Sequence, residues 1–447
     1  MKIIDAAEFD GYWGTLGAHE EDEKVVSAVR DIIAGVRKEG GAAVREFAAR
    51  FDRSAPENPL VPPEAVEQAY RAVQQDEPEL VDSLVFAARN IGEFARRQRE
   101  QFTDFEFEIA PGLFTGQRVI PVERAAIYAP GGRFPLVSSV LMGIIPARAA
   151  GVQEAILVSP PGEDGLPDRR ILAAARLAGA GRVFALGGAQ AVAALALGVP
   201  CGPATIPRVD VIAGPGNKYV AAAKRLLYGE VGIDFVAGPT DVLIIADGRD
   251  PDLRTTTAGR AACEDLIAAD LLAQAEHDPD ARARALLPGR DLAGRVESAV
   301  EKRLAALPTA AVARASLDAG GLIVVYPSME AAVRIANIVA PEHLELQVEN
   351  PASWIPALRN YGSLFVGSRA AEVLGDYSAG INHTLPTSGS ARFSAGLSVR
   401  HFLKTPTSLR CVSGSGFDAA RRAAERMAGA EGLAGHGAAA AARAYVR

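Results

Sequence analysis

A chain of 447 residues is longer than one typical domain, and its composition, 49% apolar but only 6% aromatic, suits an α/β protein in which helices pack on sheets. The net charge of −7 is spread along the chain without a run of Lys or Arg, so we expect no nucleic-acid partner. The N-terminus has no cationic segment leading into an apolar run, and no apolar stretch is long enough to cross a bilayer, which predicts a cytoplasmic protein without a membrane partner.

The first part of the chain is predicted to be helical, after a short N-terminal extension at residues 1–25. Apolar residues recur at three- and four-residue spacing between Glu21 and Phe102, in KVVSAVRDIIAGVRKEG and ELVDSLVFAARNIGEFARRQ. This spacing places the apolar side chains on one face of each helix.

Short β-rich runs then alternate with Ala-rich helical segments between Ala125 and Asp247. The runs are AAIYAP, EAILVSPP, RVFALGG, VDVIAGPG and DVLIIAD. The alternation is typical of a parallel, doubly wound sheet. Two later strands, GLIVVYP and GSLFVG, with a helix in SMEAAVRIANIVAPEH between them, indicate a second α/β layer.

The simplest arrangement of these elements is two α/β domains with doubly wound, incomplete Rossmann-like parallel sheets. Residues 26–126 and 241–392 would form the first domain, in which the early helices join the later strands. Residues 127–240 would be an inserted domain, and residues 393–447 a separate C-terminal extension. We therefore predict an α/β fold with small extensions at both ends.

Four of the six histidines lie beside carboxylates, amides or glycines near the ends of predicted elements. Gln274 and His277 are three residues apart on a predicted helix, so both side chains leave one face and could share a ligand or a metal. A solvated helix end explains them equally well. Glu342 and His343 are adjacent on a predicted loop after Pro341, where they could transfer protons in consecutive steps. From the residues alone, a surface pair is the simpler alternative.

The segment GDYSAGINHTLPTSGSARF is predicted to be a polar loop that carries Asp376 and His383. Its Gly, Ser, Thr and Asn residues have no core pattern, and such loops often hold catalytic carboxylates and imidazoles. Glu431 and His436 lie in the C-terminal extension, where a solvated helix is the alternative.

Glycine clusters follow three of the β-rich runs, in APGG (129–132), ALGGAQ (185–190) and AGPGNKYV (213–220). Each is expected to open a helix, and the backbone N–H groups of such turns suit a pyrophosphate. The usual GxGxxG fingerprint and the Walker A motif are both absent. Nucleotide binding and plain connections between strand and helix both remain open on this pattern.

These motifs together resemble the histidinol dehydrogenase family. The resemblance rests on VERAAIYAPGG, LGGAQAVAALALG, AGPGNKYVAAAKRLLYGEVGID, AGPTDVLIIAD, QAEHD, PEHLE, GDYSAGINHTLPT and EGLAGH, and it spans the chain from about Lys24 onwards. It implies an intertwined homodimer that uses NAD and one zinc per site to oxidise L-histidinol, through the aldehyde, to L-histidine.

The resemblance also implies roles for individual residues. Zinc would be held by Gln274, His277, Asp376 and His436, the last supplied by the partner subunit, as a Lewis acid and template. His343 would accept the alcohol proton, and Glu342 would activate the water that attacks the aldehyde. The remaining matches are substrate contacts at Thr240, His383 and Glu431, added to the zinc ligands and His343, and NAD contacts at Tyr128, Gln190 and Asn217.

Some positions depart from the family pattern. Thr240 and Asp241 stand where the family usually has Ser and Glu, and Ile381 and Thr384 replace the common Pro and Val. The connection between Asp247 and Gln274 is longer than usual. A related zinc- and NAD-dependent dehydrogenase acting on another small polar primary alcohol is therefore the alternative, and a binding protein without catalysis is a third.

Overall fold

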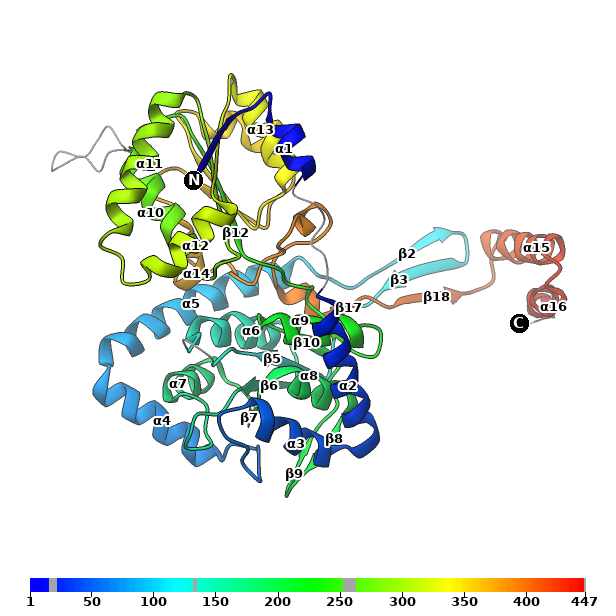
Figure 1. Ribbon diagram of the computed structural model, residues 1–447. Coiled ribbons are helices and arrows are strands. Elements are labelled where there is room, and N and C mark those ends of the chain that lie inside the picture. Colours follow the sequence, from blue (N-terminus) through cyan, green and yellow to red (C-terminus); the bar gives the residue numbers. More distant parts are fainter. Residues whose placement is uncertain (16–21, 132–134, 252–262, 446–447) are drawn as a thin grey trace.

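Two parallel sheets, each covered by helices on both faces, organise the chain (Figure 1). The computed structural model describes residues 1–15, 22–131, 135–251 and 263–445. Gly132 of the APGG motif, and residues 252–262 of the long connection after Asp247, lie outside the described residues. The predicted α/β class with two doubly wound sheets is confirmed.

The six-stranded sheet is formed mainly by the second half of the chain. Its strand order is β1-β14-β13-β12-β15-β16, and every pair is parallel. The strands are β1 (Lys2–Asp5), β12 (Asp241–Ala246), β13 (Arg282–Leu287), β14 (Leu322–Val325), β15 (His343–Gln347) and β16 (Ser363–Val366). All six residues of β12 are buried, because helices cover both faces of this sheet.

The helices of this domain divide between the two faces. One core cluster joins alternate residues of β12 to α10 (Cys263–Ala275), α11 (Arg290–Leu304) and α12 (Ala310–Gly320). The other cluster joins the intervening residues to α13 (Met329–Val339) and to Phe9 of α1 (Phe9–Thr15). The short helix α14 (Glu372–Tyr377) follows β16.

The five-stranded sheet is also parallel throughout, in the order β11-β10-β5-β6-β7. Its strands are β5 (Arg124–Tyr128), β6 (Glu154–Ser159), β7 (Arg182–Ala185), β10 (Val211–Ala213) and β11 (Gly232–Ile233). One face is covered by α2 (Glu23–Glu39), α3 (Gly41–Phe51), α8 (Gly188–Leu197) and α9 (Lys218–Leu227). The other is covered by α4 (Pro63–Asp76), α5 (Pro78–Glu100), α6 (Val137–Ala150) and α7 (Arg169–Ala178).

This packing differs from the predicted division of the chain in two respects. The early helices of residues 26–126 pack on the five-stranded sheet and not on the later strands, since Val29 and Leu84 lie in its two core clusters. Residues 1–25 are more than an extension, because β1 is an edge strand of the six-stranded sheet. The apolar stripe of a helix shows that the helix is buried, but it does not show which sheet buries it.

A long arm projects from the two domains (Figure 1). It contains an antiparallel sheet of β2 (Phe105–Ala110), β3 (Leu113–Gln117) and β18 (Thr407–Cys411), followed by α15 (Ser415–Ala430) and α16 (Ala434–Ala442). The remaining short elements are β4 (Ile120–Pro121), β8 (Val199–Cys201), β9 (Ala204–Ile206), β17 (Leu403–Lys404) and the 3-10 turns η2 (Pro351–Ser353), η3 (Ile355–Ala357), η4 (Ser390–Arg392), η5 (Val399–Phe402) and η6 (Arg443–Tyr445). Among the described residues, no helix is long and apolar enough to cross a membrane.

Candidate active site

Glu342 and His343 lie where β12 and β15 begin at the same edge of the six-stranded sheet. Val242 of β12 is paired with His343, so the residues just before both strands meet. The structure places this pair differently from the predicted surface loop: His343 is the first residue of β15, and only 5% of Glu342 and 3% of His343 is exposed. Buried side chains of this kind need partners.

The Glu342 carboxylate is held by the residues that lead into β12. Its Oε2 accepts hydrogen bonds from the Thr240 hydroxyl at 2.6 Å and from the Asp241 backbone N–H at 3.1 Å. In return, Oδ1 of Asp241 accepts from the Glu342 backbone N–H at 3.2 Å. The two strand beginnings are therefore tied by reciprocal bonds that fix the position of the Glu342 side chain.

The partners of the His343 ring define the role of each nitrogen. Nδ1 lies 3.4 Å from the carbonyl oxygen of Asp241, which can only accept a hydrogen bond, so Nδ1 carries a proton. Nε2 lies 3.4 Å from Oδ1 of Asp376. The buried Oε2 of Glu372 has no hydrogen-bond partner and lies 3.8 Å from Nδ1. The nitrogen available for proton transfer is Nε2.

Burial sets the acid–base properties of this cluster. It raises the pKa of Glu342 to about 7, against the opposing effect of the neighbouring His343 charge. For His343, burial opposes the charged form, but the charge of Glu342 and the contact with Asp376 outweigh it and raise the pKa. Burial also raises the pKa of Glu372 to about 8. Carboxyl groups whose pKa values are raised toward neutrality, as those of Glu342 and Glu372 are, are suited to proton transfer.

Two of the four predicted metal ligands, Gln274 and Asp376, lie beside this pair. The Nε2 amide of Gln274, near the end of α10, donates to the Thr240 hydroxyl at 2.7 Å. Asp376 lies in α14 and not in a loop as predicted, and α10 ends at Ala275, two residues before His277. Burial tends to raise the pKa of Asp376, but the contact with the His343 side chain and the charges of His343, His383 and His277 lower it overall.

This group of donors fits a zinc ion in its chemistry. Oδ1 of Asp376, Nε2 of His343 and Nε2 of His383 are buried without hydrogen-bond partners, and zinc takes nitrogen and oxygen ligands of these types. Within the described part of the chain, no group of three His, Cys, Asp or Glu side chains is arranged to hold a metal ion. The side chain of Gln274 adds an amide oxygen to these donors.

Glu431 and His436 are not brought to this cluster within one chain. Glu431 follows the last residue of α15, and His436 lies in α16 at the far end of the arm (Figure 1). Both are exposed. In this conformation neither residue can reach the Glu342 site of its own chain. Their place on the arm is compatible with a contribution to the site of another subunit.

The segment after α14 connects the cluster to the other domain. The Asn382 side chain, next to His383, donates to the Met142 carbonyl of α6 at 2.7 Å, and Asn90 of α5 donates to the Ser378 carbonyl at 2.8 Å. Burial lowers the pKa of His383. The cluster therefore lies at the junction of the two domains, a common position for substrate sites.

Tyr128, Gln190 and Asn217 lie at the carboxyl edge of the five-stranded sheet. Tyr128 ends β5 and Asn217 follows β10, and the strand order reverses between these two strands. Ligands of doubly wound sheets bind at this switch point. Gly214 turns the chain there with a φ of +109°, and a Cβ at this position would collide with the Tyr128 carbonyl oxygen. The geometry fits a dinucleotide.

Hydrogen bonds organise the turn before α8 and the start of α9. The Tyr128 hydroxyl accepts from the Gly188 N–H at 3.1 Å, and the buried Gln190 amide lies 3.4 Å from Oδ2 of Asp52. Asp52, which the sequence did not single out, also accepts from the Gly187 N–H at 3.1 Å. The Asn217 side chain caps α9, so its amide oxygen is already engaged.

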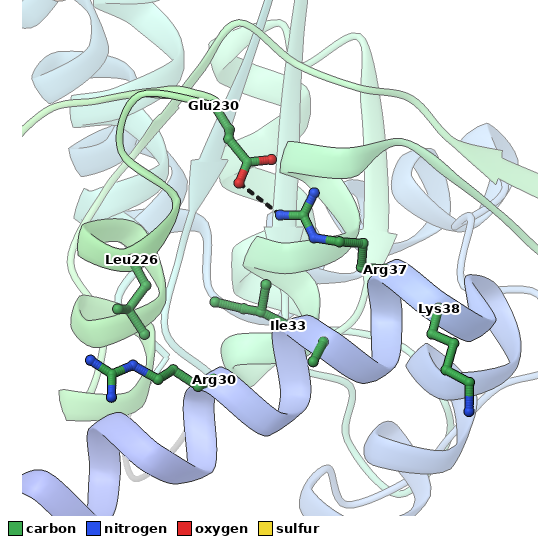
Figure 2. A pocket seen from close by; sticks show the side chains of 7 residues that line it. Arg30, Ile33, Arg37, Lys38, Leu226 and Glu230 are labelled. Carbon is green, nitrogen blue, oxygen red and sulfur yellow. Dashed lines mark hydrogen bonds and ion pairs between the residues drawn. The ribbon is translucent and has the colours of Figure 1, made fainter.

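A shallow surface pocket lies apart from these groups, between α2 and the end of α9 (Figure 2). Arg37 forms an ion pair of 2.7 Å with Glu230 in it. The pocket is lined by Arg30, Ile33, Ala34, Arg37, Lys38, Leu226 and Glu230, and contains none of the predicted site residues.

A parallel-sheet domain with glycine turns at its switch point, joined to a domain that buries an acid–base pair, defines a two-domain α/β oxidoreductase. The family model for histidinol dehydrogenase matches residues 17–444. The chain belongs to the histidinol dehydrogenase family.

Individual relatives agree with this assignment over nearly the whole chain. A histidinol dehydrogenase from Synechococcus sp. is 44% identical over 420 residues, which cover 93% of this chain and 92% of the relative. One from Thermus thermophilus is 44% identical, with 93% of both chains covered. The crystal structure of histidinol dehydrogenase from Elizabethkingia anophelis has a TM-score of 0.87 and 32% identity, and covers 99% of this chain and 97% of its own.

Proposed function

We propose that this protein oxidises L-histidinol, through the aldehyde, to L-histidine, with NAD as the electron acceptor and zinc in the site, in the cytoplasm. The observation that carries the proposal is the buried Glu342–His343 pair, whose side chains have separate partners and whose pKa values are raised. A reaction with two consecutive oxidations needs two such groups. The family relationship supports the choice of histidinol.

The first oxidation needs a base for the alcohol proton, and His343 is suited to this step. In the neutral imidazole, which forms as the pH rises above the raised pKa of His343, the Nδ1 proton is directed at the Asp241 carbonyl, which leaves Nε2 to take the hydroxyl proton. NAD, held by Tyr128, Gln190 and Asn217 at the switch point, accepts a hydride in each oxidation. The alcohol thus loses one proton and one hydride and becomes the aldehyde.

The second oxidation consumes a water molecule, and Glu342 is suited to activate it. Its carboxylate takes a proton from the water as the water oxygen bonds to the aldehyde carbon. The resulting hydrate anion then gives up a hydride to NAD and loses one further proton, and becomes the carboxylate. A pKa of about 7 makes Glu342 a stronger base than an ordinary carboxylate.

Zinc would be held by Gln274, His277 and Asp376 together with His436 of the partner subunit, and would supply a Lewis acid that orients the substrate's amine and imidazole. Thr240 and His383 of the same chain would contact the substrate, together with Glu431 of the partner subunit. The proposal therefore includes a homodimer in which the arm of each chain completes the site of the other.

A substrate screen tests the proposal. Zinc-loaded protein with NAD should produce NADH from L-histidinol at a higher kcat/KM than from other small polar primary alcohols, including amino alcohols without the imidazole ring and sulfonated diols. Selective oxidation of one of those alcohols, with none of histidinol, would assign the chain to the alternative substrate class. No oxidation of any of them would refute the enzymatic role.

A further inference from the structure

Arg284 of β13 carries a charge into the interior of the six-stranded domain. Its residue is 4% exposed, and its guanidinium Nη1 lies 3.5 Å from Oδ2 of Asp241. Burial lowers the pKa of Arg284 to about 10, although the Asp241 charge opposes this effect. A buried charge is costly unless it is paired, so the arginine and the aspartate depend on each other.

Asp241 uses its remaining polar atoms to contact both proton-transfer residues. Its Oδ1 accepts from the Glu342 backbone, and its own N–H donates to the Glu342 carboxylate. Its carbonyl oxygen lies 3.4 Å from Nδ1 of His343. One residue therefore orients Glu342 and His343 together, while one oxygen of its carboxylate faces Arg284.

The N-terminal segment covers the other side of the arginine. The guanidinium lies 5.0 Å from the centre of the Trp13 ring, and Trp13 stacks on the fully buried Phe9 at 5.3 Å. Contact with an aromatic face stabilises a cation while limiting its contact with water. The ion pair is thus enclosed between α1 and the beginning of β12.

We propose that Arg284 and Asp241 are positioning residues for the reaction: Arg284 fixes the orientation of the Asp241 carboxylate, and Asp241 in turn holds Glu342 and His343 in their working geometry. Arg284 acts through Asp241 and takes no part in the proton transfers. This inference rests on the proposed function, because it concerns the two half-reactions assigned to Glu342 and His343.

The test compares four variants of the full-length, zinc-loaded protein: Arg284→Met, Asp241→Asn, the double variant and Arg334→Met. Arg334 is the matched control, because it also holds α1, through an ion pair with Asp10 at 3.0 Å, but at the surface. For each variant, kcat and KM are measured separately from histidinol and from the aldehyde, and melting curves establish folding.

We expect Arg284→Met to lower kcat from the aldehyde by roughly 10- to 100-fold with little change in KM, because small displacements of reacting groups affect turnover strongly. Arg334→Met should keep wild-type rates. The double variant should recover part of the loss, because an amide still accepts from the Glu342 N–H and no unpaired charge is left. This partial recovery would distinguish positioning from general destabilisation.

Several outcomes would overturn the inference. One is a folded Arg284→Met protein with wild-type kcat in both half-reactions, and another is a double variant whose loss equals the product of the single losses. If Arg284→Met does not fold, a double variant slower than Asp241→Asn contradicts the inference, because Arg284 would then act other than through Asp241. A wild-type chain inactive on histidinol and its aldehyde refutes the proposed function and the positioning role together, whereas active wild-type protein with unaffected variants refutes the positioning role alone.

Discussion

Glu342 is suited to activate water, a role that differs from the one proposed for His343. It is buried with a pKa of about 7, and its carboxylate is held by Thr240 and Asp241. A carboxyl group must lose its proton before it can accept one from water. The aldehyde half-reaction should therefore accelerate as the pH rises through about 7 and then level off.

Replacement of Glu342 tests this separation of roles. Glu342→Gln should slow the aldehyde half-reaction by at least about 10²-fold, the usual contribution of a positioned base, and should affect the alcohol half-reaction less. NADH production is measured from each starting compound across neutral pH. His343→Asn should impair both half-reactions. Equal losses in both for Glu342→Gln would contradict the assignment.

Glu372 gives a prediction about stability. Its pKa in the folded protein is raised by burial from 4.5 to about 8, so the folded state retains a proton that the unfolded state releases. The stabilisation is complete below the unfolded pKa and is lost as the pH rises through the folded one. The melting temperature of Glu372→Gln should therefore fall less than that of the wild type between neutral and alkaline pH.

The exposed Glu163 offers a control for this measurement, and Glu163→Gln should follow the wild-type curve. Parallel curves for Glu372→Gln and the wild type would show that Glu372 does not retain its proton in the folded state.

At the level of elements, β13 and β15 show where prediction from the sequence failed. The structure confirms the strands that were predicted from apolar runs bounded by turns. These runs are AAIYAP, EAILVSPP, RVFALGG, VDVIAGPG, DVLIIAD, GLIVVYP and GSLFVG. The sequences RARALL and HLELQ contain charged and polar residues, yet Arg284, Glu345 and Gln347 are buried. Gln347, for example, donates to Glu345 at 2.7 Å and to Asp270 at 3.1 Å.

Site residues could be predicted where a local motif marks them, and were missed where their role depends on a partner distant in sequence. His343 and Asp376, which the sequence singled out separately, come together from β15 and α14. Arg284, Glu372 and Asp52 were missed, because each matters through a partner distant in sequence, and no local pattern indicates such a partner. Only the packing of β12 between β13 and β15 brings Arg284 to the site.

A second buried ion pair, between Lys224 of α9 and Asp234 after β11, supports the turn from β10 to α9 at the switch point. Lys224 of α9 lies 2.5 Å from Asp234 and donates to the Gly214 carbonyl at 3.0 Å, and Asp234 accepts from the Gly214 N–H at 2.8 Å. Both side chains are almost completely buried. The pair therefore holds both backbone polar groups of the glycine at which the chain turns beside Tyr128.

Loss of this pair should affect both stability and cofactor binding. Lys224→Met should reduce the free energy of unfolding by about 3–5 kcal/mol, because it leaves a buried carboxylate unpaired, and should raise KM for NAD more than KM for histidinol. Chemical denaturation and steady-state kinetics measure the two effects. Lys218→Met, which removes an exposed pair with Asp22, should leave the free energy of unfolding nearly unchanged, because water screens such a pair. A stable Lys224→Met protein with normal KM for NAD would contradict the prediction.

On the scale of the whole molecule, the arm separates Glu431 and His436 from the site of their own chain (Figure 1). The sequence predicted this C-terminal segment, but it did not predict that β2 and β3 join it or that the early helices pack on the five-stranded sheet. Those contacts connect distant parts of the chain, which periodicity alone does not specify.

A complementation experiment tests whether the sites are shared between subunits. Glu342→Gln and His436→Ala chains should each be nearly inactive in the complete histidinol oxidation. After dissociation and mixing in equal amounts, about a quarter of the sites should combine an intact Glu342 from one chain with His436 of the partner subunit. Activity should then return to a corresponding level. If heterodimers form but mixing restores no activity, the two subunits do not share their sites in this way.

The most direct test of the central claim is the stoichiometry of the complete reaction. Zinc-loaded wild-type protein is incubated with a limiting amount of L-histidinol and an excess of NAD, and NADH, histidine and the aldehyde are quantified. Two NADH and one L-histidine should form for each histidinol consumed, without accumulation of free aldehyde. One NADH per histidinol with aldehyde as the final product, or no consumption of histidinol, would contradict the central claim.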